Sequence, residues 1–190
     1  MNSEFQHQYI QSIELVFIIG LILTSFLSYY LYKRRHERFI ASLPLLSLFA
    51  HEVEEYILSP IILGDQYHFL NWAYRIGMDI SPIEVVAINA PGWILVGSLL
   101  IFKSKTNSFS KFFLFINSLL FANASFHLGV ATSQGDFSPG MVTSLFMYLP
   151  LFLYAVLLNY EKNTYFRTIC ILSVLGFIIH FVLLMRITVF

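Results

Sequence analysis

The sequence predicts an all-α, polytopic membrane protein: one domain, residues 1–190, forming a six-transmembrane-helix bundle with both termini on the outer side. Apolar residues make up 57% of the chain and charged residues 12%, whereas a soluble domain carries roughly 25% charged residues. The mean hydropathy is +0.72. A soluble protein of this length could not bury so much apolar surface in one core. The formal net charge of zero leaves no basic surface for a nucleic-acid partner.

Six stretches of the chain have the length and composition of a transmembrane helix, which needs about 20 mainly apolar residues. The first has no charged residue between positions 15 and 31 and is followed by three basic residues, so it is an anchor and not a cleavable signal peptide. Pro60 follows the second, Pro82 begins the third, and a turn at 135–140 separates the fourth from the fifth. The predicted spans are 13–32, 39–58, 82–102, 112–132, 141–160 and 166–185.

The basic residues predict how the bundle is oriented. With six spans, nine of the eleven Lys and Arg residues fall on one side of the membrane: Lys33, Arg34, Arg35, Arg38, Lys103, Lys105, Lys111, Lys162 and Arg167. The positive-inside rule places that side in the cytoplasm and both termini outside. The longest outer connection, residues 59–81, contains aromatic residues typical of a membrane interface. It is either an interfacial cap or a lid over a site.

The second span carries polar residues that are unfavourable in lipid. A carboxylate within a span costs about 2.5–3.5 kcal/mol even on the lenient insertion scale, so such residues face a protein interior. On a helix with 100° per residue, His51, Glu54 and Glu55 share one face. Glu52 points away from that face and is expected at its rim.

Polar residues of three other spans are expected at a similar depth. At about 1.5 Å of rise per residue, Glu84, Asn123, His127 and His180 all fall in the outer half of the bundle. Asn123 and His127 lie one helical turn apart on one face. The pattern therefore predicts one polar site assembled from four spans.

The motif His51-Glu52-Val53-Glu54-Glu55 is followed two spans later by Asn123-Ala-Ser-Phe-His127 and then by Ser138-Pro139-Gly140. This combination closely resembles the HXXEE-domain family of small membrane proteins, from about the second span to the fifth. The resemblance implies a site at the motif residues and names no reaction. Those residues are His51, Glu54, Glu55, Asn123 and His127.

Carboxylates and imidazoles at one depth favour a divalent metal site, with zinc preferred over iron or manganese. The expected ligands are His51, Glu55 and His127, completed by His180 or Glu84. A water at an open coordination position would have its pKa lowered toward about 7, which suits hydrolysis of a carbonyl or phosphoryl ester. Of Glu54 and Glu55, the one that is not a ligand would accept the proton. Asn123 would orient His127 or donate to a developing oxyanion.

The residues leave other interpretations open. Without a metal, the glutamates and histidines would form an acid–base pair for an isomerase or a protease. A proton- or cation-coupled transporter would use the same residue types as a relay. A buried polar cluster that only locks the helices together is the structural alternative. The expectation is a membrane-embedded hydrolase acting on a lipid or amphiphilic molecule in a bacterial cytoplasmic membrane; the sequence predicts no oligomeric state.

Overall fold

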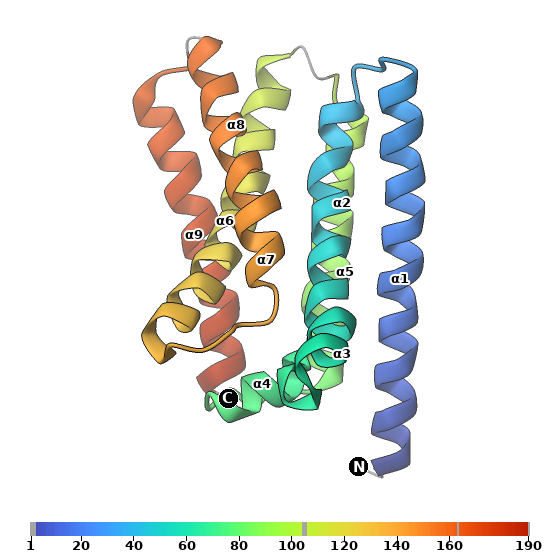
Figure 1. Cartoon of the computed structure of the whole chain (residues 1–190). Helices are drawn as coiled ribbons and strands as arrows, with labels where there is room; N and C mark the ends of the chain where they lie inside the picture. The colour runs from blue at the N-terminus through green and yellow to red at the C-terminus, as the bar shows by residue number, and fades with distance from the viewer. Residues whose placement is uncertain (1–2, 104–105, 163, 190) are drawn as a thin grey trace.

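The protein is mainly helical, and no strand occurs within residues 3–103, 106–162 and 164–189, the ranges that the computed structural model describes (Figure 1). Lys105, one of the basic residues used to predict orientation, lies outside these ranges. These ranges contain nine α-helices, and 3-10 or π-helical turns lie in some of the connections between them. The helices are α1 (Ser3–Lys33), α2 (Phe39–Val53), α3 (Ser59–Leu63), α4 (Phe69–Arg75), α5 (Pro82–Gly97), α6 (Asn107–Gln134), α7 (Met141–Thr143), α8 (Leu149–Glu161) and α9 (Phe166–Val189).

In the part of the chain that the structure describes, five helices are long and apolar enough to cross a membrane. They correspond to the first, third, fourth, fifth and sixth predicted spans: Ile10–Lys33, Pro82–Ile101, Asn107–Gln134, Met141–Glu161 and Phe166–Leu183. Large apolar side chains on their outer faces are exposed, such as Phe26 at 70% and Ile94 at 77%. So many exposed apolar side chains would be unfavourable in water but are favourable in lipid. The chain is therefore an integral membrane protein.

The second predicted span is also helical, but it differs from the other five in carrying Glu52, Glu54 and Glu55. Its helix runs from α2 through a π-helical turn, η1 (Glu54–Leu58), into α3, and it lies beside α1 (Figure 1). The sequence suggested that this helix ends before Pro60, but it does not. It continues to Leu63 and ends where Gly64 adopts a φ of 104°.

Pro60 explains why the turn Glu54–Leu58 is π-helical, which is wider than an α-helical turn. Pro60 has no N–H to donate to the carbonyl of Tyr56, and its ring would clash with that carbonyl in a regular helix. The turn just before it is π-helical, with Ser59 N donating to Glu54 O. Pro150 has the same relation to a second π-helical turn, η4 (Ser144–Tyr148). Both prolines thus widen a helix without ending it.

The two ends of the bundle differ. Both termini, the 64–81 connection and the 135–140 turn lie at one end, and the basic connections lie at the other (Figure 1). Which end faces outward stays a prediction from the basic residues. The main apolar core, which includes Ala41, Leu99, Phe113 and Ala155, lies toward the basic end. The buried histidines and glutamates, His51, Glu52, Glu54, Glu55 and His127, lie in the other half.

Candidate metal centre

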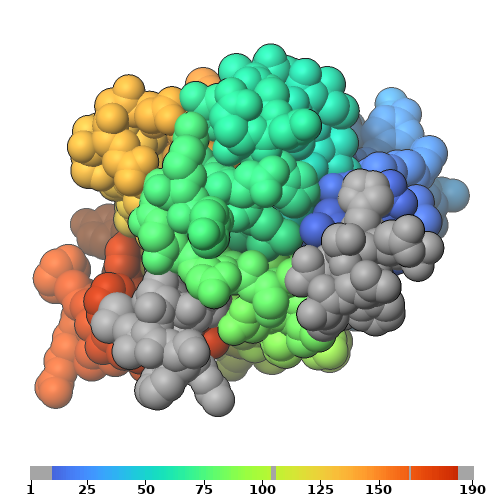
Figure 2. All heavy atoms as spheres, turned by 90° about the horizontal axis from the view of Figure 1, so that it is seen from below, coloured from blue at the N-terminus to red at the C-terminus, as the bar shows by residue number. Residues whose placement is uncertain are grey.

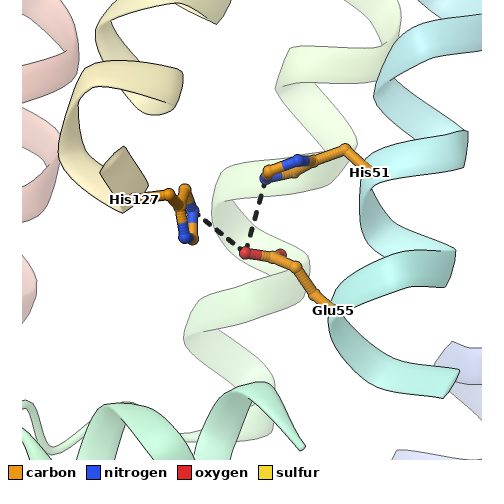
Figure 3. Close-up of side chains that lie close together, drawn as sticks. All are labelled: His51, Glu55 and His127. Carbon is orange, nitrogen blue, oxygen red and sulfur yellow. Dashed lines mark ion pairs between the residues drawn. The ribbon is translucent and has the colours of Figure 1, made fainter. Parts of the chain in front are cut away.

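Three buried side chains from two helical segments converge in the polar half of the bundle (Figure 3). His51 ends the last turn of α2, Glu55 lies one turn later in η1, and His127 projects from α6. Glu55 Oε1 lies 3.4 Å from His51 Nε2 and 3.1 Å from His127 Nε2. The three ligand atoms lie within 4.8 Å of one another, so this group could hold a metal ion.

Aromatic side chains pack around the two imidazoles and hold them in place. The Trp72 ring stacks on that of His127, with centroids 5.9 Å apart and an interplanar angle of 23°. The fully buried Tyr148 ring lies 4.8 Å from that of His51. His51 and His127 are each 1% exposed. The site is therefore shielded from bulk water and has little freedom to rearrange.

Hydroxyl groups determine which nitrogen of each histidine faces Glu55. The Thr143 hydroxyl donates to the Gly140 carbonyl oxygen at 3.1 Å, so it accepts from His51 Nδ1–H at 2.8 Å. A hydroxyl carries only one hydrogen, and this assignment puts the lone pair of a neutral His51 on Nε2. Ser138 makes the same pair of contacts, with His127 Nδ1 at 3.0 Å and, at a longer 3.5 Å, with the Pro139 carbonyl.

The Nε2 atoms of both histidines and a carboxylate oxygen of Glu55 thus point at one another, and neither His51 Nε2 nor Glu55 Oε1 has a hydrogen-bond partner. A bound cation would satisfy such a set. Tetrahedral zinc has ligand distances of about 2.0–2.2 Å, which puts neighbouring ligand atoms about 3.4 Å apart. The 3.1 and 3.4 Å separations from Glu55 Oε1 to His127 and His51 are close to that spacing, and the two histidine nitrogens lie within 4.8 Å of each other. The residues present fit a divalent ion.

Glu54 lies next to this group but has a different role. Its two carboxylate oxygens accept the backbone N–H groups of Val142 at 2.9 Å and Thr143 at 2.7 Å, at the start of the helix formed by α7, η4 and α8. Free N–H groups and the helix dipole at a helix N-terminus favour such a carboxylate. Glu54 thus holds Thr143 against His51, and its oxygens are already hydrogen-bonded. The expected proton-accepting role of Glu54 stays a prediction.

Asn123 and His180, both expected at the site, line a cavity that also borders Glu55. His180 lies close enough to His127, His51 and Glu55 to interact with their charges. It is not part of the group of three. Glu52 lines the same cavity and is only 3% exposed, so its expected place at an exposed rim is wrong. The reason is that α5 packs against this side of α2 and brings Asn89 next to the Glu52 carboxyl.

Glu84, expected as a fourth ligand, lies at the start of α5 and caps that helix. Its Oε2 accepts from the Ser81 backbone N–H at 2.7 Å and from the Ser81 hydroxyl at 2.6 Å, and the Glu84 N–H donates back to the Ser81 oxygen. This is a capping box, which satisfies N–H groups that a helix start leaves free. The structure does not bring Glu84 into the group of three.

The 64–81 connection covers the site. Figure 2 views the bundle from this end and shows the connection (green) across the centre of the face. Phe69 and Trp72 of this connection pack toward His127. At the surface, Asp136 accepts from the Tyr67 hydroxyl at 2.7 Å and pairs with Arg75 at 3.2 Å. The Tyr67 hydrogen bond lowers the pKa of the Asp136 carboxyl and raises the pKa of the Tyr67 hydroxyl.

Sequence reasoning missed the roles of Ser138, Thr143 and Trp72. The signal for Ser138 was present, since it begins the Ser138-Pro139-Gly140 element of the family resemblance. Gly140 has a φ of +84°, and a Cβ built there would lie 2.4 Å from His51 Cε1. Glycine is therefore required for the chain to pass this close to the histidine. Thr143 and Trp72 carried no signal, because their contacts depend on how distant segments fold together.

The fold and the site define an integral membrane protein with a buried His/Glu group that could hold a metal ion. A family model described as "Protein of unknown function with HXXEE motif" matches residues 42–155. The chain belongs to this family, which confirms the resemblance seen in the sequence, and the His-x-x-Glu-Glu motif is His51 to Glu55. No curated protein and no solved structure matched the chain.

Proposed function

We propose that this protein is a six-span membrane hydrolase that uses one divalent ion, held by His51, Glu55 and His127, to cleave a lipid or another amphiphile in a bacterial cytoplasmic membrane. The observation that carries the proposal is the convergence of both imidazole Nε2 atoms on Glu55 Oε1, with both Nδ1 atoms bound to hydroxyl groups. Two histidines and one glutamate form a ligand set used by catalytic zinc sites, which keep one position open. Zinc is therefore favoured over iron or manganese.

Burial of the glutamates supports a sixth span. Glu52, Glu54 and Glu55 are 3–6% exposed, so none of them would meet lipid. At about 1.5 Å per residue, the helix Phe39–Leu63 is long enough for roughly 30 Å of hydrocarbon. With this helix the chain crosses an even number of times, in agreement with both termini at one end (Figure 1).

Different residues of the site have different roles in the proposed hydrolysis. Bound at this site, the ion would supply a polarised water and a Lewis acid at neutral pH. His51, His127 and Glu55 hold the ion, and Asn123, on the wall of the adjoining cavity, is placed to donate to a developing oxyanion. In the hydrolysis, the water oxygen bonds to the acyl carbon, the bond to the leaving alcohol breaks, and the water proton passes to that alcohol. Because the site lies within the membrane-spanning bundle, its substrate is an amphiphile.

Metal analysis of the purified protein tests the proposal. Detergent-purified protein is expected to contain about one zinc ion per chain, because the site supplies three protein ligands. His127→Ala removes one ligand and is expected to lower the bound ion to about a tenth of that amount or less. His36→Ala is the matched control, since His36 lies in the exposed turn after α1, and it is expected to keep the ion. Protein free of transition metal, or His127→Ala with unchanged metal content, would favour the metal-free acid–base interpretation.

The hydroxyl that orients His51 provides a second prediction. Thr143→Val keeps the shape of the side chain but removes the acceptor for His51 Nδ1–H, and loss of such a contact typically lowers metal affinity about 10–100-fold. Thr143→Ser keeps the hydroxyl group and is expected to bind the ion as tightly as wild type does. Thr24→Val is the control, because it makes the same change at a threonine whose hydroxyl bonds only to carbonyls of its own helix. A competitive chelator titration measures all three; equal affinities for Thr143→Val and Thr24→Val would exclude the orienting role.

A further inference from the structure

A cavity of about 90 Å³ adjoins the metal centre, and neither His51 nor His127 is among its lining residues. Glu55 forms part of its wall, so the cavity and the metal centre share a residue. The remaining walls come from α2, the 64–81 connection, α5, α6 and α9. A water molecule needs about 10–15 Å³ of such space, so the cavity has room for several waters or for a small polar group.

Polar atoms without partners face this cavity. Within the described ranges, Glu52 Oε2, Asn123 Oδ1 and His180 Nε2 are buried atoms that have no hydrogen-bond partner, and all three residues line the cavity. The Glu52 residue is buried, with an exposed fraction of 3%. Leaving such atoms unpaired is costly, and native proteins rarely do so where nothing binds. Two of the three atoms, the oxygens, are acceptors, so the missing partner is a donor of hydrogen bonds.

The described side chains that line the cavity do not favour an anionic ligand. No lysine or arginine occurs among the described residues that line it. The acidic groups there are Glu52 and Glu55, and a phosphate would meet both without a basic partner. Phosphate recognition ordinarily uses arginine, lysine or a helix N-terminus. The group that fits this cavity is therefore uncharged and bears hydroxyl or amide donors.

The remaining wall is apolar and reaches the surface of the bundle. Val85 and Ile88 of α5 face Leu183 of α9 across the cavity. Leu183 is 39% exposed, so this side of the cavity borders the surface that lipid covers in the membrane. A ligand with a polar head and an apolar tail can place its head beside Glu52 and its tail against these side chains.

We propose that this cavity is the head-group subsite of the enzyme, and that it selects an uncharged acyl ester or amide whose head bears hydroxyl or amide donors. Glu52 and Asn123 accept from those donors, and the acyl carbon lies toward Glu55 and the ion. Phosphate esters are rejected. The inference rests on the proposed function for the reaction, but head-group binding is measured separately from metal content and from turnover.

Binding of two probes that share a tail tests the subsite. The probes are 1-monododecanoylglycerol, an uncharged ester with two hydroxyl groups, and dodecyl phosphate, titrated by calorimetry into the full-length protein in a maltoside detergent. Wild type is expected to bind the glycerol ester about tenfold or more tightly than the phosphate, since its hydroxyl groups can donate to Glu52 and Asn123, whereas the phosphate meets no lysine or arginine among the described lining residues. Glu52→Gln and Asn123→Leu are each expected to weaken binding of the glycerol ester about tenfold while keeping the bound ion.

Asn117→Leu is the matched control, because Asn117 lies on the same helix and bonds to a carbonyl of α6; it is expected to bind both probes as wild type does. Glycerol-ester binding that is unchanged in both Glu52→Gln and Asn123→Leu overturns the subsite, as does equal affinity of wild type for the two probes. Two ions per chain, with one lost in Glu52→Gln, would also overturn it and make the cavity a second ion site. Selective binding by protein that contains no metal supports the subsite and contradicts only the proposed metal chemistry.

Discussion

Glu55→Gln is expected to abolish metal binding while leaving the protein folded. The Glu55 carboxylate lies between both imidazole nitrogens, and an amide supplies neither the negative charge nor an equally strong ligand oxygen. Loss of an anionic ligand from a site with three protein ligands is expected to lower zinc affinity about 100-fold or more. The side chain keeps its volume, so the thermal unfolding of the metal-free variant is expected to remain cooperative.

Glu54→Gln is the matched comparison, because it makes the same chemical change one residue earlier. Glu54 accepts two backbone N–H groups at the start of α7, and hydrogen bonds to charged groups contribute about 1.5–3 kcal/mol each. Glutamine can accept through only one oxygen. Glu54→Gln is therefore expected to lower the free energy of unfolding by about 2 kcal/mol while retaining the ion.

Two measurements on each variant separate these roles: bound metal by elemental analysis and stability by thermal unfolding. The expected result is a crossed pattern, in which Glu55→Gln loses the ion and Glu54→Gln loses stability. If both variants lose stability equally and neither changes metal content, the paired glutamates form only a polar cluster between helices, and the proposed metal centre is wrong.

The helical architecture could be predicted because hydropathy is a local property of the chain. Long apolar stretches such as 13–32 and 166–185 can satisfy their backbone hydrogen bonds in lipid only as helices, and the structure has α1 and α9 there. The second span was harder to place. Hydropathy alone does not assign Phe39–Leu63 to the membrane, because Glu52, Glu54 and Glu55 lower its apolar character.

The separate roles of Glu54 and Glu55 could not be predicted from helical geometry. On a regular helix the two glutamates flank one face with His51, which suggests that both reach the same point. In the structure, Glu55 contacts the histidines and Glu54 contacts the start of α7. Two features cause the difference: the π-helical turn before Pro60, and the distant segment 138–143 that packs beside it. Neither is visible in a helical projection of the second span.

Depth along the helices predicted which residues could share a site, but not how each would be used. Asn123, His127 and His180 all face the polar half of the bundle, as their positions along the chain suggested. Glu84 has a similar depth, but it lies three residues after Ser81, and that spacing is typical of a capping box. Glu84 therefore caps the start of α5, and this local role accounts for its position.

Gly140→Ala is expected to lower both the stability of the protein and its affinity for zinc. Its φ of +84° is unfavourable for any residue with a Cβ, and the added carbon would lie 2.4 Å from His51 Cε1 and 3.1 Å from Glu55 Cγ. The left-handed conformation costs alanine about 1–2 kcal/mol, and overpacking against a buried side chain costs about 1–3 kcal/mol more. Because the histidine has to move away, zinc affinity is expected to fall about tenfold or more as well.

Gly135→Ala separates the backbone effect from the effect on the site. Gly135 also has a positive φ, +63°, but a Cβ there would meet nothing within 4 Å. It is therefore expected to lose only the backbone contribution of about 1–2 kcal/mol and to bind zinc as wild type does. Thermal unfolding and chelator titration of both variants measure the difference. If Gly140→Ala loses stability without losing zinc affinity, the ion does not depend on the position of His51; if it loses both, the close passage of the 138–143 segment over His51 is part of the metal centre.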